Sequence, residues 1–345
     1  MEQTPQTPQA PKMPHNQTDR EFVFRIVICA IAVLALSAAI TLMIRGIVLD
    51  ANATKRLMAE AFMSYQAETP QTPETTEKQP SITTTAPPAP ETTSPPEVTE
   101  ESVSLVSASL SNKQVGINNY TSYTVDENAL SKHQFEFYTG KGVPVVLILH
   151  SHITECYAPN GATAVSATFN FENTDTSQNI FAVGEAIAEV LSASGIGVIH
   201  ATEEASDAEA LISEYRTAYP SIKFVLDVHR DGMYTTDGRI VRTDGKIADS
   251  PAAELMLAVG TNSQNGGSDW QKNLAAAYQL SAMITEAEPQ IMRNILLRPE
   301  GLGQQYAPSS LSLYVGTTGN TLPEALTAAR FFARYNAIFI LSAIK

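Results

Sequence analysis

The stretch VPVVLILHSHITECY (residues 143–157) decides the fold when it is read together with FVLDVHRD (residues 224–231). Each stretch opens with a short run of β-branched and aliphatic residues, a pattern that is typical of a strand buried in a parallel sheet. The first run stops at two histidines one residue apart, and the second stops at a third histidine. Ligands of open α/β sheets bind outside the carboxyl ends of the strands. The two stretches therefore predict a metal site at one edge of a parallel sheet.

Strand and helix patterns alternate along the chain around these stretches. The strand patterns cover residues 143–149, 196–199, 222–228, 255–259 and 311–315, and the helix patterns cover residues 178–193, 207–219, 269–287 and 322–344. Ser177 is placed to cap the first of these helices and Gly195 to end it, and residues 127–137 show a weaker helical pattern. The alternation predicts an α/β domain with a mainly parallel sheet and flanking helices.

An apolar segment near the N-terminus has the length of a membrane span. Residues 26–44 carry no charge, and Arg25 and Arg45 bracket them. A helix of that length crosses about 30 Å of hydrocarbon. We therefore predict one transmembrane helix over residues 26–48, a disordered cytoplasmic tail over residues 1–25, and a C-terminal domain on the extracytoplasmic side of the cell membrane. A cleaved signal peptide is the alternative, although no clear small-residue cleavage site follows the segment.

Residues 66–101 form a linker that is rich in Pro, Thr and Glu. The segment holds eight prolines and almost no large apolar side chains, so it is predicted to be disordered. An extended chain of this length reaches on the order of 100 Å. The linker is either a plain tether or a spacer that holds the following domain inside a cell-wall layer, and both fit its composition. The α/β domain is predicted to follow over residues 103–345.

The charge of the chain excludes one class of function. The formal net charge is -14 and the sequence pI is about 4.9, whereas a nucleic-acid-binding protein needs a basic face to neutralise phosphates. We therefore expect no nucleic-acid partner. The two cysteines, Cys29 and Cys156, are not expected to form a disulfide, because Cys29 lies in the apolar N-terminal segment.

Four residues in the two stretches have the chemistry of zinc ligands. A zinc hydrolase uses three ligands drawn from His, Asp and Glu and leaves one position open for water, and a carboxylate usually acts as the base. His150, His152, Glu155 and His229 supply these types. Residues i and i+2 of a strand share a face, so the sequence leaves open which of His150 and His152 binds the metal. A histidine that only makes hydrogen bonds is the alternative for each position.

The other polar residues nearby give weaker signals. Arg230 and Asp231 are expected either to form a pair that orients His229 or to be a surface ion pair. His133 and His200 have no carboxylate partner at a telling spacing. They are therefore expected to be structural.

Five motifs in a fixed order resemble the stage II sporulation protein P family. They are ILHSHITECY (residues 148–157), Asn179 followed by Val183-Gly184, LDVHRDG (residues 226–232), VGT (residues 259–261) and NTLPEA (residues 320–325). The resemblance covers residues 103–345, and the anchor and linker also match the layout of the family. It implies an amidase-like α/β domain of the phosphorylase/hydrolase-like type.

This resemblance implies a membrane-anchored, zinc-dependent peptidoglycan hydrolase. Its activity would be that of an N-acetylmuramoyl-L-alanine amidase, which cuts the amide between N-acetylmuramic acid and L-alanine, with an accompanying endopeptidase activity on peptide cross-links. The implied partners are peptidoglycan and the sporulation proteins D and M, in septal wall degradation and engulfment. The histidines of the first motif fall on His150 and His152, its glutamate on Glu155, and the histidine of the second motif on His229.

One position departs from the family pattern. A late strand in the family reads like L-(I/L)-E-V-G, and its glutamate is expected to act on the attacking water or on the leaving amine. Here the strand reads LSLYVG, and Tyr314 stands at that position. Tyrosine, with a pKa near 10, is a poor base at neutral pH. Glu155 or Asp231 would then supply the base, and Arg230 and Tyr314 would contact the substrate or the metal ligands.

Three functions are compatible with these features. The first is an active zinc-dependent amidase. The second is a catalytically weakened or inert family member that binds peptidoglycan and scaffolds partner proteins. The third, from a different class, is a tethered α/β binding module without a metal. Zinc binding without turnover would single out the second, and absence of zinc would favour the third or a degraded form of the second.

Overall fold

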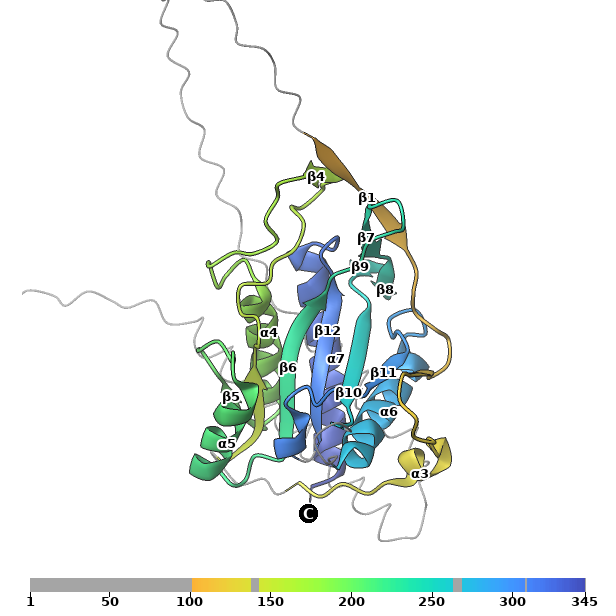
Figure 1. Cartoon of the computed structure of the whole chain (residues 1–345). Helices are drawn as coiled ribbons and strands as arrows, with labels where there is room; N and C mark the ends of the chain where they lie inside the picture. The colour runs from red at the N-terminus through yellow and green to blue at the C-terminus, as the bar shows by residue number, and fades with distance from the viewer. Residues whose placement is uncertain (1–100, 138–142, 263–268, 308, 345) are drawn as a thin grey trace, which may run out of the picture. The chain divides into compact units, whose positions relative to one another are not determined.

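A seven-stranded sheet forms the centre of the described part of the chain (Figure 1). The structure is a computed structural model, and it describes residues 101–137, 143–262, 269–307 and 309–344. In spatial order the strands are β2 (Ile117–Asn119), β11 (Ile295–Arg298), β10 (Leu255–Gly260), β12 (Ser310–Thr317), β6 (Phe224–Asp231), β3 (Pro144–Leu149) and β5 (Gly197–His200). The five strands predicted from the sequence are confirmed as β3, β5, β6, β10 and β12, whereas the sequence patterns do not predict β2 and β11.

The sheet is mixed, because five of its six strand pairings are parallel, as the sequence predicts, and one is antiparallel. β5, β3, β6 and β12 run parallel to one another, and so do β2, β11 and β10. The two groups meet at β10 and β12, which pair antiparallel. The chain reverses direction there because β11 and β12 are joined by a short segment with a 3-10 turn (Gln304–Tyr306), not by the helical crossover of a parallel connection. The carboxyl ends of β5, β3, β6 and β12 therefore lie at one edge of the sheet.

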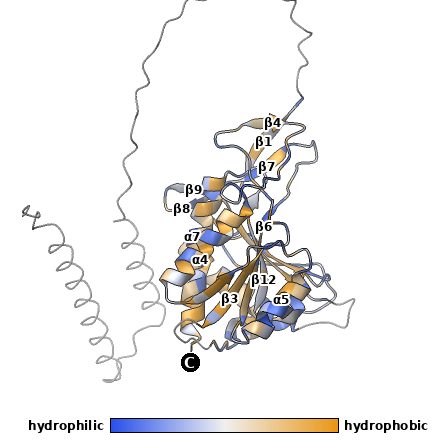
Figure 2. Ribbon diagram, turned by 90° about the vertical axis from the view of Figure 1, so that its left-hand side faces the viewer, coloured by the Kyte–Doolittle hydropathy of each residue, from blue (hydrophilic) through white to orange (hydrophobic). Residues whose placement is uncertain are grey.

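Helices cover both faces of the sheet (Figure 2). On one face, α7 (Leu322–Ser342) packs against α4 (Ile180–Ala193) and α6 (Trp270–Ala287). α5 (Ala208–Ala218) lies on the other face. The four long helices predicted from the sequence are therefore confirmed, and the apolar strands are covered from both sides.

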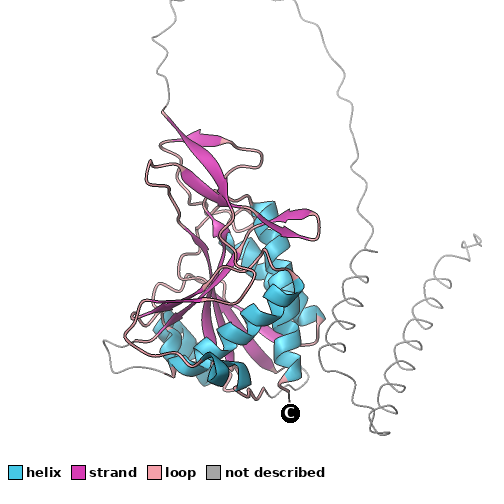
Figure 3. Ribbon diagram, turned by 90° about the vertical axis from the view of Figure 1, so that its right-hand side faces the viewer, coloured by secondary structure: helices cyan, strands magenta, loops and turns pink. Residues whose placement is uncertain are grey.

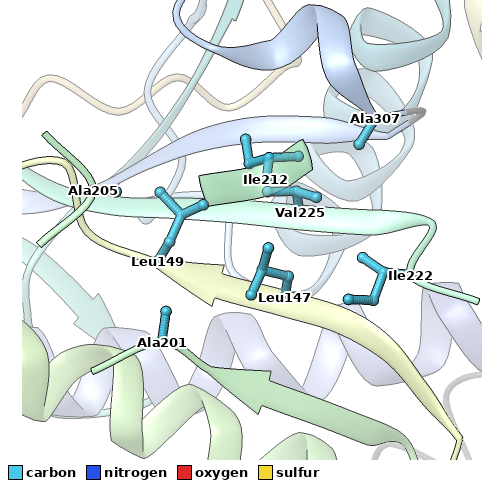
Figure 4. Close-up of a cluster of buried hydrophobic side chains, with 8 residues drawn as sticks. All are labelled: Leu147, Leu149, Ala201, Ala205, Ile212, Ile222, Val225 and Ala307. Atoms are coloured by element: carbon cyan, nitrogen blue, oxygen red, sulfur yellow. The ribbon is translucent and has the colours of Figure 1, made fainter. Parts of the chain in front are cut away.

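The core beneath α5 is built from aliphatic side chains at alternate strand positions (Figure 4). Leu147 and Leu149 of β3 and Val225 of β6 belong to one buried cluster with Ile212 of α5. Successive strand residues point to opposite faces, and the intervening residues of β3 are also buried. Burial of each such side chain contributes about 1.5–3 kcal/mol. A strand with helices on both faces therefore needs the continuous apolar run seen in the sequence.

The start of α4 differs from the sequence prediction. The N-cap is Asn179, whose side chain accepts a hydrogen bond from the N–H of Phe181 at 2.8 Å. Ser177, the predicted cap, donates its hydroxyl to Asp175 instead. Both residue types can cap a helix, so composition alone does not choose between them. α3 (Glu127–Lys132) is also shorter than the weak helical pattern there predicts.

A smaller sheet projects beyond the helices (Figure 3). It consists of β4 (Ala164–Ser166), β1 (Ser102–Ala108) and β7 (Ile240–Thr243), and a hairpin of β8 (Gly245–Ile247) and β9 (Ser250–Ala252) accompanies it. β1 starts close to the predicted beginning of the domain. Most of these strands are too short to show a periodic pattern, which is why the sequence does not predict them.

The predicted tail (residues 1–25), the predicted transmembrane helix (residues 26–48) and the linker up to residue 100 lie outside the described residues. None of the helices that the structure describes is long and apolar enough to cross a membrane. All described residues belong to one compact unit, Thr83–Lys345.

Candidate functional site

Two neighbouring strands present polar side chains in register near the carboxyl edge of the parallel group. Asp227 of β6 is paired with Ser312 of β12, and His229 is paired with Tyr314. Alternate strand residues share a face, and all four residues line one cavity of ≈ 570 Å³. The sequence pattern predicts a strand that ends at residue 228, just before His229. In the structure β6 continues to Asp231, so His229 lies within the strand.

The walls of this cavity come from the segments that follow β3 and β5 and from the segment that precedes β12. They include Ser151, His152, Glu155, Glu204, Ala205, Ser206, Ala208, Leu302 and Gly303. Three of the predicted ligands, His152, Glu155 and His229, therefore line the same cavity as Tyr314. No Lys or Arg is among the lining residues, so the cavity carries an excess of acidic side chains.

His229 is held on both sides of its ring by carboxylates. Its Nε2 lies 2.9 Å from Oδ2 of Asp227, and its Nδ1 lies 3.5 Å from Oε2 of Glu155. Burial alone would lower the pKa of His229, but the two carboxylates outweigh burial and raise the pKa to about 10. The ring of Tyr314 stacks on the same imidazole at a centroid distance of 5.5 Å. Without a metal, His229 is therefore an imidazolium at neutral pH.

Asp227 is a site residue that the sequence analysis misses. Its Oδ1 accepts the backbone N–H of Ser151 at 3.0 Å, and its Oδ2 accepts the Ser151 hydroxyl. Burial would raise the pKa of Asp227, but hydrogen bonds from His229 and Ser151 lower it overall. In the sequence, Asp227 is hidden in an otherwise apolar run. Its position two residues before His229, on the same strand face, is the signal that could have identified it.

Glu155 is fixed by the strand that carries His229. Its Oε2 accepts the backbone N–H of Arg230 at 3.0 Å. The guanidinium group of Arg230 donates to the carbonyl oxygens of Cys156 at 2.6 Å and Phe171 at 2.7 Å. Arg230 thus ties the segment that begins after Glu155 to β6.

Asp231 does not pair with Arg230, so the predicted pair is wrong. Oδ2 of Asp231 accepts a hydrogen bond from Nη1 of Arg293 at 2.9 Å, and Asp231 is not among the residues that line the cavity. Neighbouring residues of a strand point to opposite faces, which separates the two side chains. His229 is oriented by Asp227 instead.

The donor atoms around His229 fit part of a zinc site. Two ligand atoms bonded to one tetrahedral zinc ion lie about 3.4 Å apart, close to the 3.5 Å between His229 Nδ1 and Glu155 Oε2. Asp227 is then the carboxylate that holds the other ring nitrogen of a metal-binding histidine. The ring of His152 is exposed, with its centroid 5.7 Å from that of His229. Within the described residues no three His, Cys, Asp or Glu side chains are grouped closely enough to hold a metal, so His152 would have to turn to complete the set.

His150 belongs to a different cluster. Residues 151–154 form a turn directly after β3, so the alternation that would place His150 and His152 on one face does not continue. The Nδ1 of His150 lies 2.9 Å from the carbonyl oxygen of Val228. The side chain is fully buried, and burial lowers its pKa to about 4. His150 is therefore neutral at pH 7 and lies outside the cavity.

His200 and Glu185 complete this second cluster. The Nε2 atoms of His150 and His200 lie 2.9 Å apart, and Nδ1 of His200 lies 2.9 Å from Oε2 of Glu185. Glu185 is not close to His200 at a spacing that the sequence reveals, and it is α4 that brings the carboxylate to the histidine. A Cβ at Gly184 would lie 2.5 Å from His150 Nε2 and 2.7 Å from His200 Nε2, so the close approach of α4 requires glycine. His133, at the C-cap of α3, lies apart from this cluster.

Tyr314 is held beside His229 by the register of β12 and β6. The register shifts after Tyr314, and Gly316 has φ +68, where a Cβ would clash with two neighbouring side chains. Burial, together with nearby Asp227 and Asp231, raises the pKa of Tyr314 above its ordinary value. The hydroxyl therefore stays protonated at neutral pH. It can donate a hydrogen bond but cannot act as a base.

A comparison with protein-family models identifies the family of the chain. A model described as stage II sporulation protein P matches residues 50–337. The chain belongs to this family. The match includes both histidine stretches and the strand that carries Tyr314, in agreement with the resemblance seen in the motifs. A comparison with curated proteins found no match.

Several solved structures are similar to the chain at low sequence identity. The N-acetylmuramoyl-L-alanine amidase AmiC2 of Nostoc punctiforme has a TM-score of 0.38 at 13% identity and covers 59% of this chain and 97% of its own. The CwlD amidase from Clostridioides difficile, in complex with the GerS lipoprotein, has a TM-score of 0.35 at 13% identity, with 58% and 98% covered. The apo form of Ami1 from Mycobacterium abscessus has a TM-score of 0.34 at 15% identity, with 59% and 98% covered. Similarity at this level says nothing about individual site residues.

Proposed function

We propose that this member of the stage II sporulation protein P family is a zinc-dependent hydrolase of the bacterial cell wall. Its reaction would be that of an N-acetylmuramoyl-L-alanine amidase on peptidoglycan, with an endopeptidase activity on cross-links, in septal wall degradation and engulfment. The observation that carries the proposal is the pair of donor atoms His229 Nδ1 and Glu155 Oε2, 3.5 Å apart in a cavity of a chain that belongs to this family.

His229, Glu155 and His152 are the residues that would hold the zinc ion. A zinc ion bound there would lower the pKa of a water molecule and polarise the carbonyl group of the scissile amide. Asp227 accepts a hydrogen bond at Nε2 of His229, so Nδ1 is the nitrogen left for a metal. The backbone N–H of Arg230 binds Oε2 of Glu155 and limits the rotation of that carboxylate.

Tyr314 would serve as a hydrogen-bond donor and not as the base. Its protonated hydroxyl group can donate to charge that develops on the carbonyl oxygen or to the leaving amine. The sequence offers two carboxylates for the base. Glu155 lines the cavity, and Asp231 is bound by Arg293 outside it. This distribution favours Glu155, which would bind the zinc ion through Oε2, the oxygen that faces His229, and accept the proton of the water molecule at its other carboxylate oxygen.

We also propose that the α/β domain acts outside the cytoplasmic membrane. The support is the uncharged segment of residues 26–44 followed by the Pro/Thr/Glu linker of residues 66–101, together with a family match that begins at residue 50. Peptidoglycan would be the substrate. The sporulation proteins D and M are the proposed protein partners, through the family relationship.

Tyr314 also favours a second candidate function. A side chain that cannot accept a proton at neutral pH stands beside His229, where a carboxylate would be the stronger acid–base group. Losing a positioned acid–base group typically lowers the rate about 10²–10⁴-fold. The second candidate is therefore a protein that binds zinc and peptidoglycan and scaffolds partners with little or no cleavage.

The test is the release of stem peptides from purified sacculi by the full-length protein in detergent. Wild type is compared with and without added zinc and a chelator, and zinc content is measured in parallel. We expect wild type to release stem peptides and the chelator to stop the release. Glu155→Gln should abolish it, whereas Glu189→Gln, which changes an exposed glutamate of α4, should leave it unchanged.

The variant Tyr314→Glu separates the two candidate functions. If wild type holds zinc but only Tyr314→Glu releases stem peptides, the natural chain is a binding protein and the amidase proposal fails. If neither protein holds zinc or releases peptides, both candidates fail.

A further inference from the structure

A second cavity begins at the residue that follows Glu155. Its volume is ≈ 550 Å³. It is lined by residues 156–160, Phe169, Asn173, Ser177, Gln178, Leu322, Pro323 and Leu326. The segment after β3 therefore contributes Glu155 to the candidate active site and its next residues to this second cavity. The activity proposed above makes no use of the second cavity.

The lining of this cavity is uncharged. No Asp, Glu, Lys or Arg is among its residues, in contrast to the acidic candidate active site. Apolar groups come from Phe169, Pro323 and Leu326, and side-chain amides come from Asn173 and Gln178. Surfaces that bind proline-rich segments combine aromatic and apolar contacts with hydrogen-bond donors for the exposed carbonyl groups of an extended chain. The cavity has both kinds of group and would not favour a charged ligand.

The chain enters the domain next to this cavity. The carbonyl oxygen of Glu101 accepts a hydrogen bond from the N–H of Ala167 at 2.8 Å, and Ser102 pairs antiparallel with Ser166. Phe169, a lining residue, is hydrogen-bonded back to Ser166 at 2.9 Å. Glu101, where the described part of the chain begins, is therefore bonded to Ala167, two residues before the lining residue Phe169.

The sequence before Glu101 contains a segment that matches the lining. Residues 92–96 read TTSPP and lie between Glu91 and Glu97, so they are the uncharged part of this stretch. An extended chain covers about 3.3 Å per residue, so the five residues from Pro96 to Glu101 can span at most about 17 Å. The local concentration of a segment tethered this closely is in the millimolar range.

We propose that residues 92–96 of this same chain bind in the second cavity. The two prolines, Pro95 and Pro96, supply rings for the apolar lining, and their restricted backbone lowers the entropy lost on binding. The bound segment contacts the residues directly after Glu155. It thus ties the end of the linker to the loop that carries a candidate metal ligand.

Cys156 provides a direct probe, because it lines this cavity and is 6% exposed. The experiment measures the rate at which a small neutral thiol reagent labels Cys156 in the full-length protein, with Cys29→Ser removing the only other cysteine. The test variant carries Pro95→Gly and Pro96→Gly. The matched control carries Pro70→Gly and Pro73→Gly, which change two prolines farther from Glu101.

If the segment occupies the cavity, the test variant should label at least about fivefold faster than wild type, since the measured rate scales with the fraction of open cavity. The control should label at the wild-type rate. Leu326→Asp, which changes the cavity and not the linker, should also speed labelling, and circular dichroism checks that it is folded. Combining it with the proline changes should add little further, because both act on one contact.

Equal rates in wild type and the Pro95→Gly/Pro96→Gly variant would overturn the proposal. A second result would also overturn it: the proline changes leave the labelling rate of Cys156 unchanged, but added muropeptides lower it. The cavity would then bind the cell wall and not the linker. Neither result depends on whether the protein cleaves peptidoglycan.

Discussion

Arg230 holds Glu155 by its backbone N–H, which donates to Oε2 of that carboxylate at 3.0 Å. The same residue binds the carbonyl oxygens of Cys156 and Phe171 through its guanidinium group. β6 therefore carries His229 and also positions the carboxylate that lies 3.5 Å from it. The guanidinium group fixes the segment directly after Glu155, so we expect it to help set the distance between the two donor atoms.

This arrangement predicts that Arg230→Ala weakens zinc binding although Arg230 is not a ligand. The variant keeps the backbone N–H that binds Glu155 but loses the two guanidinium hydrogen bonds that fix the segment after Glu155. We expect zinc affinity to fall about 10-fold or more, as for other residues that orient metal ligands. Competition with a chelating dye measures the affinity. Arg230→Lys keeps the charge but cannot bind both carbonyl oxygens in a planar fork, so it should lie between wild type and Arg230→Ala.

The matched control for this prediction is Arg239→Ala. Arg239 makes an exposed ion pair with Asp237 away from the cavity, and such pairs contribute little. Unchanged zinc affinity in Arg230→Ala would show that Glu155 is positioned without the guanidinium group.

Asp227→Asn should also lower zinc affinity, by about 10–100-fold. The carboxylate of Asp227 accepts a hydrogen bond at Nε2 of His229 and so leaves Nδ1 free for a metal. An amide can present its NH₂ group to the ring, which would favour the wrong tautomer. Isothermal titration of the metal-free protein with zinc measures the change. Ser151→Ala removes only one of the hydrogen bonds to Asp227 and should lower zinc affinity less than Asp227→Asn does. A larger loss in Ser151→Ala would argue against the role of Asp227 in orienting His229.

The strands and helices that carry the site could be predicted because their patterns are long. The run of residues 143–149 is buried on both faces, which leaves an apolar sequence with few other interpretations. The direction of β12 could not be predicted. It depends on a short connection after β11, and nothing in the strand itself records whether its neighbour runs parallel or antiparallel.

Residue type alone was enough to group Glu155 with His229, and the structure brings their side chains within 3.5 Å of each other. The site was not predictable where geometry decides. His150 and His152 differ only in that a turn begins at residue 151, which sends the first to His200 and the second to the cavity. The contact between His150 and His200 also depends on how α4 packs on the sheet, because Gly184 of that helix lies against both rings.

Buried His150 should make the metal-free protein sensitive to acid. Its pKa is about 6.5 in the unfolded chain and about 4 in the folded protein, so the unfolded state binds more protons between these values. Neutral His150 therefore costs the folded state nothing above pH 6.5. As the pH falls from 6.5 toward 4, protonation of His150 in the unfolded chain lowers the free energy of unfolding. At 1.36 kcal/mol per pKa unit, the total loss is about 3 kcal/mol.

Urea unfolding at pH 7 and pH 5, with a chelator present, measures this effect in wild type and in His150→Gln. The free energy of unfolding of wild type should fall more between the two pH values than that of the variant. His229, with its raised pKa, stays protonated in both folded proteins over this range, so its contribution is the same in both and cancels in the comparison. Parallel pH dependences in the two proteins would mean that His150 is not held neutral by the fold.

Gly184→Ala is expected to destabilise the protein, against the usual preference of helices for alanine. Alanine in a helix interior is favoured over glycine by about 1 kcal/mol. Here the added Cβ would lie 2.5 Å and 2.7 Å from the Nε2 atoms of His150 and His200, so α4 must shift, at about 1–3 kcal/mol for an overpacked core. Chemical denaturation measures the change, with Gly232→Ala as control because no atom lies within 4 Å of its Cβ position. If the clash is the cause, the loss should shrink in a His200→Ala background, since the two changes then act on one contact.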